Sequence, residues 1–220
     1  MRRRPPAASA RPVVSRVVGR VVGLVLAGAL VAGCSSSTAE GDGGYRAAVT
    51  HDPYPVSATP LTDTDGQPYS LAKDTDKPVT LVFFGYSSCP DICQVVMANV
   101  ASALTRLDEA DRSSVDVVFV TTDPKVDTEQ HLRDYLDRFD PSFIGLTGDL
   151  DTIAAIGKPL AVYVADGERL PSGGRDLNSH SSQVTAITAD DTSPLLWTQD
   201  TSSADLAADL HTLLAEEADR

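Results

Sequence analysis

The sequence is poor in cysteine and in basic residues, and each scarcity narrows what the protein can be. It holds three cysteines in 220 residues, which is too few for a disulfide framework and leaves one cysteine to be explained separately. Acidic residues outnumber lysine and arginine by 31 to 18, for a net charge of −13. No basic stripe with interleaved aromatic residues is present, so we expect no nucleic-acid partner, because an acidic body repels phosphate backbones.

The remaining composition is that of an ordinary folded domain. Hydrophobic residues make up 42% of the chain and charged residues 22%, which excludes collagen-like, low-complexity and wholly disordered chains. A chain of 220 residues is long enough for a targeting signal and one domain with a buried core, but short for two ordinary domains. We therefore expect a single domain at residues 46–220.

The first 33 residues have the pattern of an export signal. Residues 1–20 contain arginines and no acidic residue, and residues 21–33 form an apolar run that ends in small residues before Cys34. That run is too short to span a hydrocarbon core comfortably, which takes about 20 apolar residues, so a spanning helix is the lesser alternative. The junction resembles the lipobox of bacterial lipoproteins, in which the signal is removed before the cysteine and the sulfur receives a diacylglycerol.

The lipobox resemblance implies a membrane-anchored protein. Residues 1–33 would be removed and Cys34 lipidated, while residues 34–45, which are rich in glycine and serine, would form a flexible tether. The protein would then lie at the outer face of the cytoplasmic membrane. The alternative is an ordinary cleaved signal with an incidental Cys34.

The apolar runs of the domain predict an α/β fold. Residues 79–84 and 115–121 are continuous apolar and β-branched runs, as expected for strands that are covered on both faces. Between them, residues 92–107 have apolar residues at helical spacing. Strand, helix and strand at this length predict a βαβ crossover with a parallel strand pair.

The flanking segments complete a recognisable element order. A polar turn at Asp65 and Gly66 predicts an N-terminal β-hairpin over residues 61–71. We further predict helices at 128–139 and 150–156, an extended piece at 143–146, strands at 160–164, 184–188 and 195–198, and a C-terminal helix with a capping box at Ser202 and Asp205. This is the order of a thioredoxin-like fold with an N-terminal hairpin and an inserted helical segment.

Cys89 and Cys93 stand where the first buried run gives way to a helix, and Pro90 between them suits the first helical position. On a helix, this spacing separates the two Cα atoms by about 6 Å, near the upper end of the disulfide range of about 4.4–6.8 Å. The pair can therefore form a disulfide or hold an ion. The positive helix end favours thiolate, so we expect a lowered pKa for at least Cys89.

Two cysteines rarely complete a metal site, and the sequence offers four histidines. His51 lies in the N-terminal approach, whereas His131 and His211 lie in amphipathic helices. His180 follows a long polar loop and immediately precedes the strand at 184–188, so in a thioredoxin-like layout it could reach the start of the helix. From spacing alone, a metal ligand and a loop histidine without a function remain equally open.

Four successive motifs resemble those of the SCO/SenC family. They are GYSSCPDIC at 85–93, DPKVDT at 123–128, IGLTG at 144–148 and the His-Ser pair that begins at His180. The resemblance extends over roughly residues 56–217. Ser88, Gln94, Val126 and Glu129 depart from the residues that are usual in the family.

The SCO/SenC resemblance implies a thioredoxin-fold, membrane-tethered metallochaperone that helps to load the CuA centre of cytochrome c oxidase. Cys89 and Cys93 would be the thiolate ligands of copper, as Cu(I) or Cu(II), and His180 the imidazole ligand. The implied partners are the oxidase subunit that carries CuA and a thiol-disulfide reductase. Asp123 and Asp127 are candidates for groups that support the ligands, although helix capping is an equally good explanation for them.

The donor set distinguishes among the remaining functions. Two thiolates and an imidazole are soft ligands that favour copper, and three ligands leave a position open for transfer, whereas structural zinc usually has four. The alternative function is an extracytoplasmic thiol-disulfide oxidoreductase, in which Cys89 attacks a partner disulfide and Cys93 resolves the mixed disulfide without a metal. A third is a tethered binding module that performs no turnover.

Overall fold

The computed structural model describes residues 44–164, 168–169, 175–176 and 181–220. The strands are β1 (Val49–Pro55), β2 (Leu61–Asp63), β3 (Pro68–Tyr69), β4 (Val79–Gly85), β5 (Val115–Thr121), β6 (Ile144–Thr147), β7 (Glu168–Arg169), β8 (Arg175–Asp176), β9 (Val184–Thr188) and β10 (Thr192–Trp197). The helices are α1 (Ile92–Leu104), α2 (Glu109–Ser113), α3 (Glu129–Leu136), α4 (Leu150–Gly157), the 3₁₀ helix η2 (Lys158–Leu160) and α5 (Ser203–Ala218). Eight strands form one mixed sheet in the order β1-β10-β9-β4-β5-β6-β2-β3.

The centre of the sheet confirms the predicted βαβ crossover. β4 and β5 pair in parallel along their whole length, from Val79 opposite Val115 to Gly85 opposite Thr121. Every residue of β4 is buried, as the continuous apolar run predicts for a strand between two layers of helix. The connecting helix α1 ends at Leu104, before the predicted end, and the short helix α2 that follows it was not predicted.

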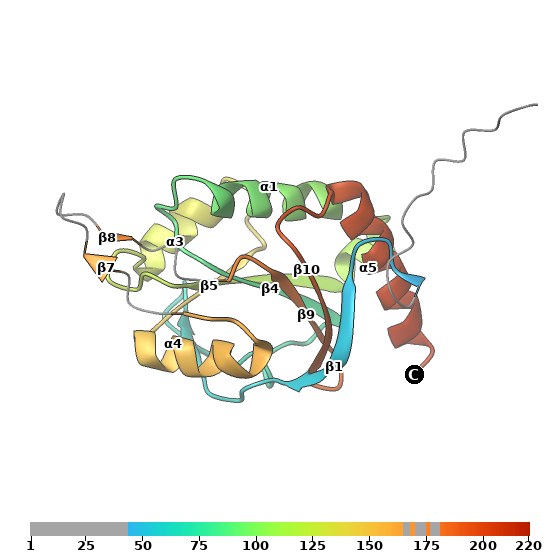
Figure 1. Cartoon of the computed structure of the whole chain (residues 1–220), viewed down its shortest axis with the longest axis horizontal. Coiled ribbons are helices and arrows are strands. Elements are labelled where there is room, and N and C mark those ends of the chain that lie inside the picture. The colour runs from blue at the N-terminus through green and yellow to red at the C-terminus, as the bar shows by residue number, and fades with distance from the viewer. Residues whose placement is uncertain (1–43, 165–167, 170–174, 177–180) are drawn as a thin grey trace, which may run out of the picture. The chain divides into compact units, whose positions relative to one another are not determined.

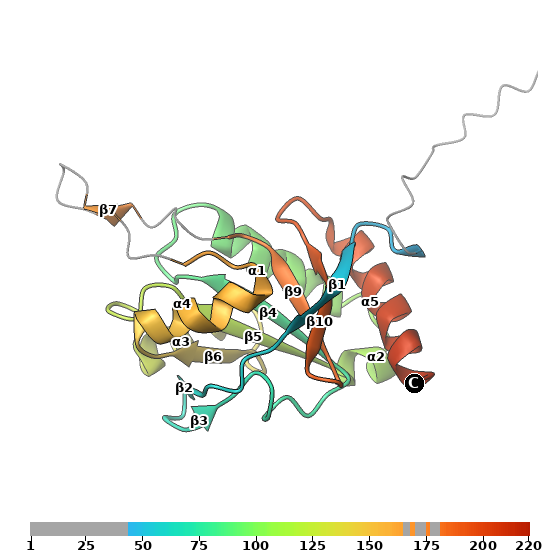
Figure 2. The same ribbon diagram turned by 60° about the horizontal axis from the view of Figure 1, so that its bottom comes forward.

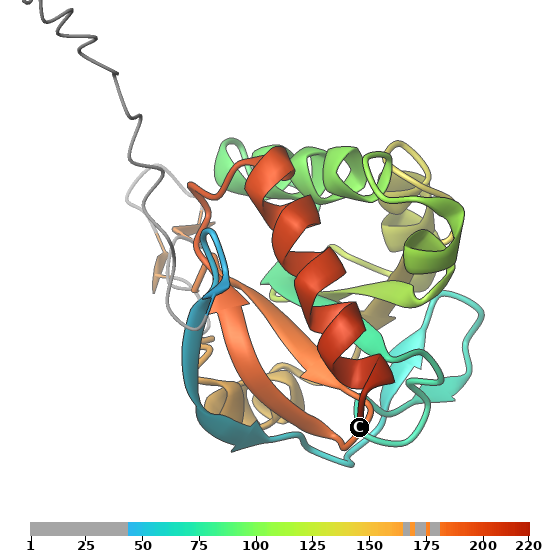
Figure 3. The same cartoon turned by 90° about the vertical axis from the view of Figure 1, so that its right-hand side faces the viewer.

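Side chains of β4 alternate between two cores, one on each face of the sheet. Leu81 and Phe83 pack in the core that includes residues of α1, α3 and α5, whereas Val82 and Phe84 pack with residues of α4. Figure 1 shows α4 on the opposite side of the sheet from α1, and Figure 3 shows α5 beside α1. The result is a three-layer α/β domain in which α1 starts just beyond the end of the central strand β4.

The edges of the sheet contain one predicted and one unpredicted element. The predicted hairpin forms β2 and β3, and Gly66 adopts the left-handed φ of 75° in its turn. β2 pairs with β6, so the hairpin lies at one edge, while β1 forms the other edge beside β10 (Figure 2). β1 was not predicted, because its residues are exposed or half-buried and give no apolar alternation.

The C-terminal part confirms the predicted antiparallel pair and final helix. β9 pairs with both β10 and the central strand β4. The N–H of Asp205 donates to the Ser202 hydroxyl oxygen over 3.1 Å, which is half of the predicted capping box of α5. α3 and α4 also form close to their predicted ranges.

The strand predicted at 160–164 is wrong. The chain leaves α4 through η2 and turns at Ala161, whose φ of 56° is left-handed. The N–H of Val162 donates to the carbonyl of Gly157 over 3.0 Å, which closes the turn. Leu160 and Val162 are nevertheless buried, so their apolar character marks a turn packed on the core rather than a strand.

A buried carboxylate on α5 fixes the segment that precedes β1. Asp209 accepts hydrogen bonds from the main-chain N–H groups of Arg46, Ala47 and Ala48, over 2.5, 2.9 and 2.8 Å. Trp197 donates its indole N–H to the same carboxylate over 3.0 Å. Because Asp209 is only 1% exposed, these donors offset the cost of burying its charge.

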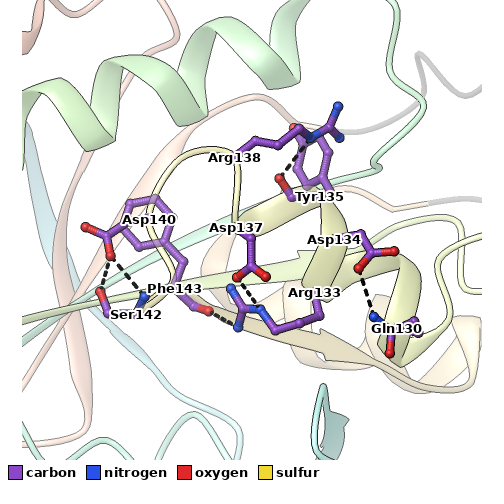
Figure 4. A network of polar contacts seen from close by, with 9 residues as sticks. All are labelled: Gln130, Arg133, Asp134, Tyr135, Asp137, Arg138, Asp140, Ser142 and Phe143. Carbon is purple, nitrogen blue, oxygen red and sulfur yellow. Dashed lines mark hydrogen bonds and ion pairs between the residues drawn. The ribbon is translucent and has the colours of Figure 1, made fainter.

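The helix that follows the second sequence motif is anchored by an arginine. Arg133 of α3 donates to the carboxylate of Asp137 and to the carbonyl of Phe143, each over 2.8 Å (Figure 4). The guanidinium of Arg138 lies 4.8 Å from the ring centroid of Tyr135, which packs in the core. The bond to Phe143, the residue that precedes β6, connects α3 to the start of that strand.

The predicted signal at 1–33 and Cys34 lie outside the described residues, as does the predicted tether up to residue 43. Their processing and lipidation therefore remain predictions. Within residues 44–164 and the later described segments, no helix has both the length and the apolar character needed to cross a membrane.

Candidate metal centre

Both candidate cysteine ligands lie at the start of α1, with buried side chains. Cys89 ends a tight turn in which its N–H donates to the carbonyl of Tyr86 over 3.2 Å, and Cys93 lies in the first turn of the helix. α1 begins directly after Asp91, so the prediction that Pro90 occupies the first helical position is wrong. Cys89 is 2% exposed and Cys93 is fully buried.

The sulfur of Cys89 caps the helix in place of a carboxylate. The N–H of Cys93 donates to Sγ of Cys89 over 3.4 Å, whereas the side chain of Asp91 makes no capping hydrogen bond. Burial by itself raises the pKa of the Cys89 thiol. Hydrogen bonds from the Cys93 thiol and from the N–H groups of Asp91 and Cys93 together lower the pKa by more than burial raises it, so the net pKa is lowered. The predicted direction for Cys89 is confirmed.

Cys93 has the opposite tendency. Burial raises the pKa of its thiol, and the hydrogen bond to Cys89 and the charge on Cys89 raise it further. Neither cysteine is in a disulfide, and in the reduced pair Cys89 loses its proton more readily than Cys93. A soft cation bound between the sulfurs would replace the thiol protons, because metal ligation requires deprotonated thiols.

Cys93 fits beside the end of β4 because residue 85 is glycine. A Cβ at Gly85 would lie 2.6 Å from a ring carbon of Phe83, 3.1 Å from Sγ of Cys93 and 3.3 Å from a ring carbon of Phe119. The backbone of β4 therefore approaches the Cys93 sulfur more closely than any larger residue allows. Two aromatic rings complete the wall on this side of the cysteine pair.

A buried aspartate lies behind the turn that carries Cys89. The carboxylate of Asp127 accepts from the N–H of Ser87 over 3.0 Å, from the Ser87 hydroxyl, and from the hydroxyl of Thr121 over 2.7 Å. Thr128 is the N-cap residue of α3, so the helix-capping explanation is wrong for both Asp123 and Asp127. Asp127 instead binds the residue two positions before Cys89.

Ser87 and Thr121 were not predicted as parts of this arrangement. Ser87 lies 40 positions from Asp127, and nothing in the local pattern of either segment connects them. The only available signal was topological, because the ends of the parallel strands β4 and β5 meet at one edge of the sheet.

The four histidines have different outcomes. His180 lies outside the described residues, so its assignment as the third ligand stays a prediction. His51 and His131 lie in β1 and α3, and His211 of α5 is paired with Asp111 over 2.6 Å. Among the residues that the structure describes, no cluster of three histidine, cysteine or acidic side chains is arranged to hold a metal ion.

Comparison with known proteins identifies the family. The model of the SCO1/SenC family matches residues 55–215. The chain belongs to the SCO1/SenC family. Protein SCO2, mitochondrial, from Saccharomyces cerevisiae is 35% identical over 103 residues, which cover 47% of this chain and 34% of the yeast protein. The chain thus spans only about a third of the length of that curated relative.

Solved SCO structures show the same fold. The structure of Bradyrhizobium japonicum ScoI with copper bound is 28% identical in sequence, with a TM-score of 0.61. The match covers 75% of this SCO1/SenC chain and 99% of the ScoI chain. BsSco, a member of the Sco family of cytochrome c oxidase assembly proteins in which a disulfide switch was identified, is 20% identical, with a TM-score of 0.60 and coverage of 74% and 96%. These neighbours confirm the thioredoxin-like fold.

Proposed function

We propose that this SCO1/SenC protein is a membrane-tethered metallochaperone that delivers copper to, or reduces the cysteines of, the CuA site during cytochrome c oxidase assembly. The observation that carries the proposal is the buried pair of sulfurs in hydrogen-bond contact at the start of α1. Two relatives support it: the Bradyrhizobium japonicum ScoI structure holds copper, and BsSco belongs to a family of oxidase assembly proteins.

The cysteine pair fits copper as cargo. Thiolate and imidazole are the soft and intermediate donors that copper binds well. Cys89, whose pKa is lowered, supplies the first thiolate, and Cys93 becomes the second on losing its proton. With His180 as the third ligand, the ion keeps an open position through which an acceptor thiolate or imidazole could take it over.

The N-terminal sequence supports a location beside that acceptor. Lipidation of Cys34 would anchor the protein at the outer face of the cytoplasmic membrane. A tether from Cys34 to Gly44 spans at most about 35 Å when extended, because each residue adds about 3.3–3.6 Å. The domain would therefore work close to the membrane surface, where an oxidase subunit carrying CuA could reach it.

The opposite pKa shifts of the two thiols favour a second candidate function, a metal-free thiol-disulfide oxidoreductase. The Cys89 thiolate would attack one sulfur of a partner disulfide and release the other as a thiol. Cys93 would then lose its proton and attack Cys89, leaving a Cys89–Cys93 disulfide and a fully reduced partner. A separate thiol-disulfide reductase would return the pair to the reduced state.

Copper titration of the reduced full chain separates the two functions. We expect stoichiometric copper binding with a thiolate-to-Cu(II) charge-transfer band that weakens or shifts in His180→Ala and is unchanged in His131→Ala, the matched control on α3. An unaltered band and affinity in His180→Ala would remove His180 from the ligand set. Oxidoreductase activity toward a protein disulfide would instead be lost in Cys89→Ser and survive His180→Ala.

Oxidase assembly in cells tests the delivery step itself. A deletion strain should lose assembled oxidase when copper is scarce and regain it when copper is plentiful, because free copper then bypasses the chaperone. Re-expression of Cys34→Ala, which lacks the anchoring cysteine, should restore less oxidase than the unaltered protein. Intact assembly in the deletion strain at low copper would contradict a role in delivery.

A further inference from the structure

Asp127 connects three of the four sequence motifs, and the proposed function leaves it without a task. It belongs to the motif at 123–128, its carboxylate binds Ser87 in the motif at 85–93, and its main-chain carbonyl accepts from the hydroxyl of Thr147 over 3.1 Å in the motif at 144–148. The ligand assignment uses only the cysteines of the first motif and the histidine of the fourth. The second and third motifs therefore need their own physical explanation.

The hydrogen bonds of Asp127 use both carboxylate oxygens. Oδ2 accepts from the N–H of Ser87 and from the hydroxyl of Thr121, and Oδ1 accepts from the hydroxyl of Ser87. Asp127 and Thr121 are fully buried, and Ser87 is 6% exposed. Thr121 also accepts from the N–H of Asp123 over 2.9 Å, so the network extends from the end of β5 into the segment that carries Asp127.

Ser87 lies inside the turn that positions the nucleophilic sulfur. The turn begins at Tyr86, whose carbonyl accepts from the N–H of Cys89, and its base is joined to β5 by a hydrogen bond from Thr122 to the carbonyl of Gly85 over 2.6 Å. The Asp127 carboxylate binds both the N–H and the hydroxyl of Ser87 and so fixes the position of the turn. The orientation of the turn decides whether Sγ of Cys89 meets the N–H groups at the start of α1.

We propose that Asp127 is the positioning residue of the metal centre. Its buried carboxylate holds the turn at residues 86–89, so that the Cys89 sulfur stays against the N–H of Cys93 in the orientation in which it binds copper. The copper part of this inference rests on the proposed function, whereas the placement of the sulfur does not depend on any metal. Thr121 and Thr147 each donate a hydrogen bond to Asp127 and so fix its position. The second and third motifs thereby share one role.

The amide variant Asp127→Asn tests this role with little change in volume. An amide keeps only one accepting oxygen, so the Ser87 hydroxyl has to turn and accept from the new NH2 group, and all three contacts lose the strength that a carboxylate gives them. Released from its cap position, the Cys89 sulfur of the reduced form loses its hydrogen bond from the N–H of Cys93, which destabilises the reduced form. Equilibration with reduced and oxidised glutathione should then show an equilibrium shifted about tenfold toward the disulfide, which corresponds to a reduction potential lower by about 30 mV.

Copper binding provides the second readout. The copper affinity of the reduced full chain should fall by about 10–100-fold in Asp127→Asn, the range found when groups that orient metal ligands are removed. Ser87→Ala, which loses only the hydroxyl contact, should shift both quantities in the same direction by less. Ser87→Thr, which keeps the hydroxyl, should restore both values to near those of the unaltered protein.

Asp209→Asn is the matched control, because it makes the same substitution at a buried carboxylate that binds the N-terminal segment and not the cysteine turn. It should lower stability and leave the potential and copper affinity unchanged. Equal shifts in Asp209→Asn and Asp127→Asn, or no shift in a folded Asp127→Asn, would overturn the positioning role. If Asp127→Asn does not fold, the same two readouts in Ser87→Ala decide the question.

The outcomes also separate this inference from the proposed function. If the unaltered chain binds no copper while Asp127→Asn still shifts the glutathione equilibrium, the metallochaperone proposal fails and the positioning of Cys89 stands. If the unaltered chain binds copper and Asp127→Asn matches it in both affinity and potential, the positioning role fails and copper binding stands.

Discussion

Asp127 and Asp209 are both buried, and the carboxylate of each accepts several hydrogen bonds. The two residues stabilise different parts of the molecule. Asp209 accepts three successive main-chain N–H groups and an indole N–H, and joins segments that lie 161 to 163 positions apart in the chain. Asp127 accepts one main-chain N–H and two side-chain hydroxyls, and its partners surround the cysteine turn.

The difference lies in what can be removed without disturbing the backbone. The donors to Asp209 are mainly backbone N–H groups, which no substitution other than proline removes, so that carboxylate serves the scaffold. Two of the donors to Asp127 are hydroxyls that can be deleted singly. The same buried charge thus stabilises the fold in one place and orients a reactive sulfur in the other.

The largest effect that separates the two regions is expected for Asp209→Ala. It leaves several buried N–H groups without an acceptor, and hydrogen bonds to a charged group contribute about 1.5–3 kcal/mol each, so we expect a loss of about 4 kcal/mol after partial rehydration. Urea denaturation of the reduced chain measures this loss. Asp63→Ala, at the exposed hairpin turn, should cost less than about 1 kcal/mol; a similar cost for both would mean that Asp209 does not hold the scaffold.

Gly85→Ala alters the cysteine pair on the side of Cys93, away from the turn that Asp127 holds. The added methyl meets Phe83 and Sγ of Cys93, so we expect destabilisation of about 2 kcal/mol from overpacking, together with weaker copper binding. Urea denaturation and copper titration measure the two effects. Gly66→Ala in the hairpin turn is the control, since it meets no atom within 4 Å and should cost stability through its positive φ while leaving copper affinity unchanged.

Thr121→Val deletes a single hydroxyl donor to Asp127. Leaving one carboxylate contact unmade should cost about 1.5 kcal/mol and weaken copper binding. Thr80→Val is the matched control, because the Thr80 hydroxyl on β4 is buried without a hydrogen-bond partner among the described residues, and its replacement should be neutral or slightly stabilising. Equal effects of the two substitutions would show that the Thr121 hydroxyl contributes nothing to the network.

The smallest expected effect is the pH dependence that Cys89 gives to the reduced protein. Its pKa is lowered on folding, so its stabilisation is complete above the unfolded value of about 8.5 and disappears as pH falls through the folded pKa. Denaturation midpoints should therefore rise with pH below about 8.5, and Cys89→Ser should abolish that part of the rise. Asp209→Asn should leave it intact, whereas a rise that persists in Cys89→Ser would contradict the assignment.

Local patterns predicted the elements that carry the cysteines. Buried strands 79–84 and 115–121 and the helix between them follow from continuous apolar runs and helical spacing, which burial on both faces imposes. Exposed β1 gave no such signal, and the turn at Ala161 has the same apolar residues as a strand. Apolar patterns therefore report burial, whereas a short apolar run such as 160–164 does not by itself distinguish a strand from a buried turn.

The candidate site was predictable to a smaller extent. Cys89 and Cys93 stand out by their spacing at a strand-to-helix junction, and His180 by resemblance to the SCO/SenC motifs. The bonds from Asp127 to Ser87 and Thr121 depend on how two strand ends meet, which is a property of the tertiary structure. Polar contacts between distant segments leave no periodic mark in the sequence, so they emerged only from the structure.

The contacts of Asp209 also have a mechanical consequence for a protein held by its N-terminus. β1 is an edge strand whose pairing with β10 is interrupted between Thr50 and Tyr54, and a pull along the chain would otherwise peel it away one hydrogen bond at a time. Residues 46–48 precede that strand and are bonded to α5, so a pull applied at the N-terminal side, as the proposed anchor at Cys34 would apply it, meets several hydrogen bonds before it reaches the sheet. Asp209 therefore protects the edge strand β1 from force that is applied at the N-terminal side of the domain.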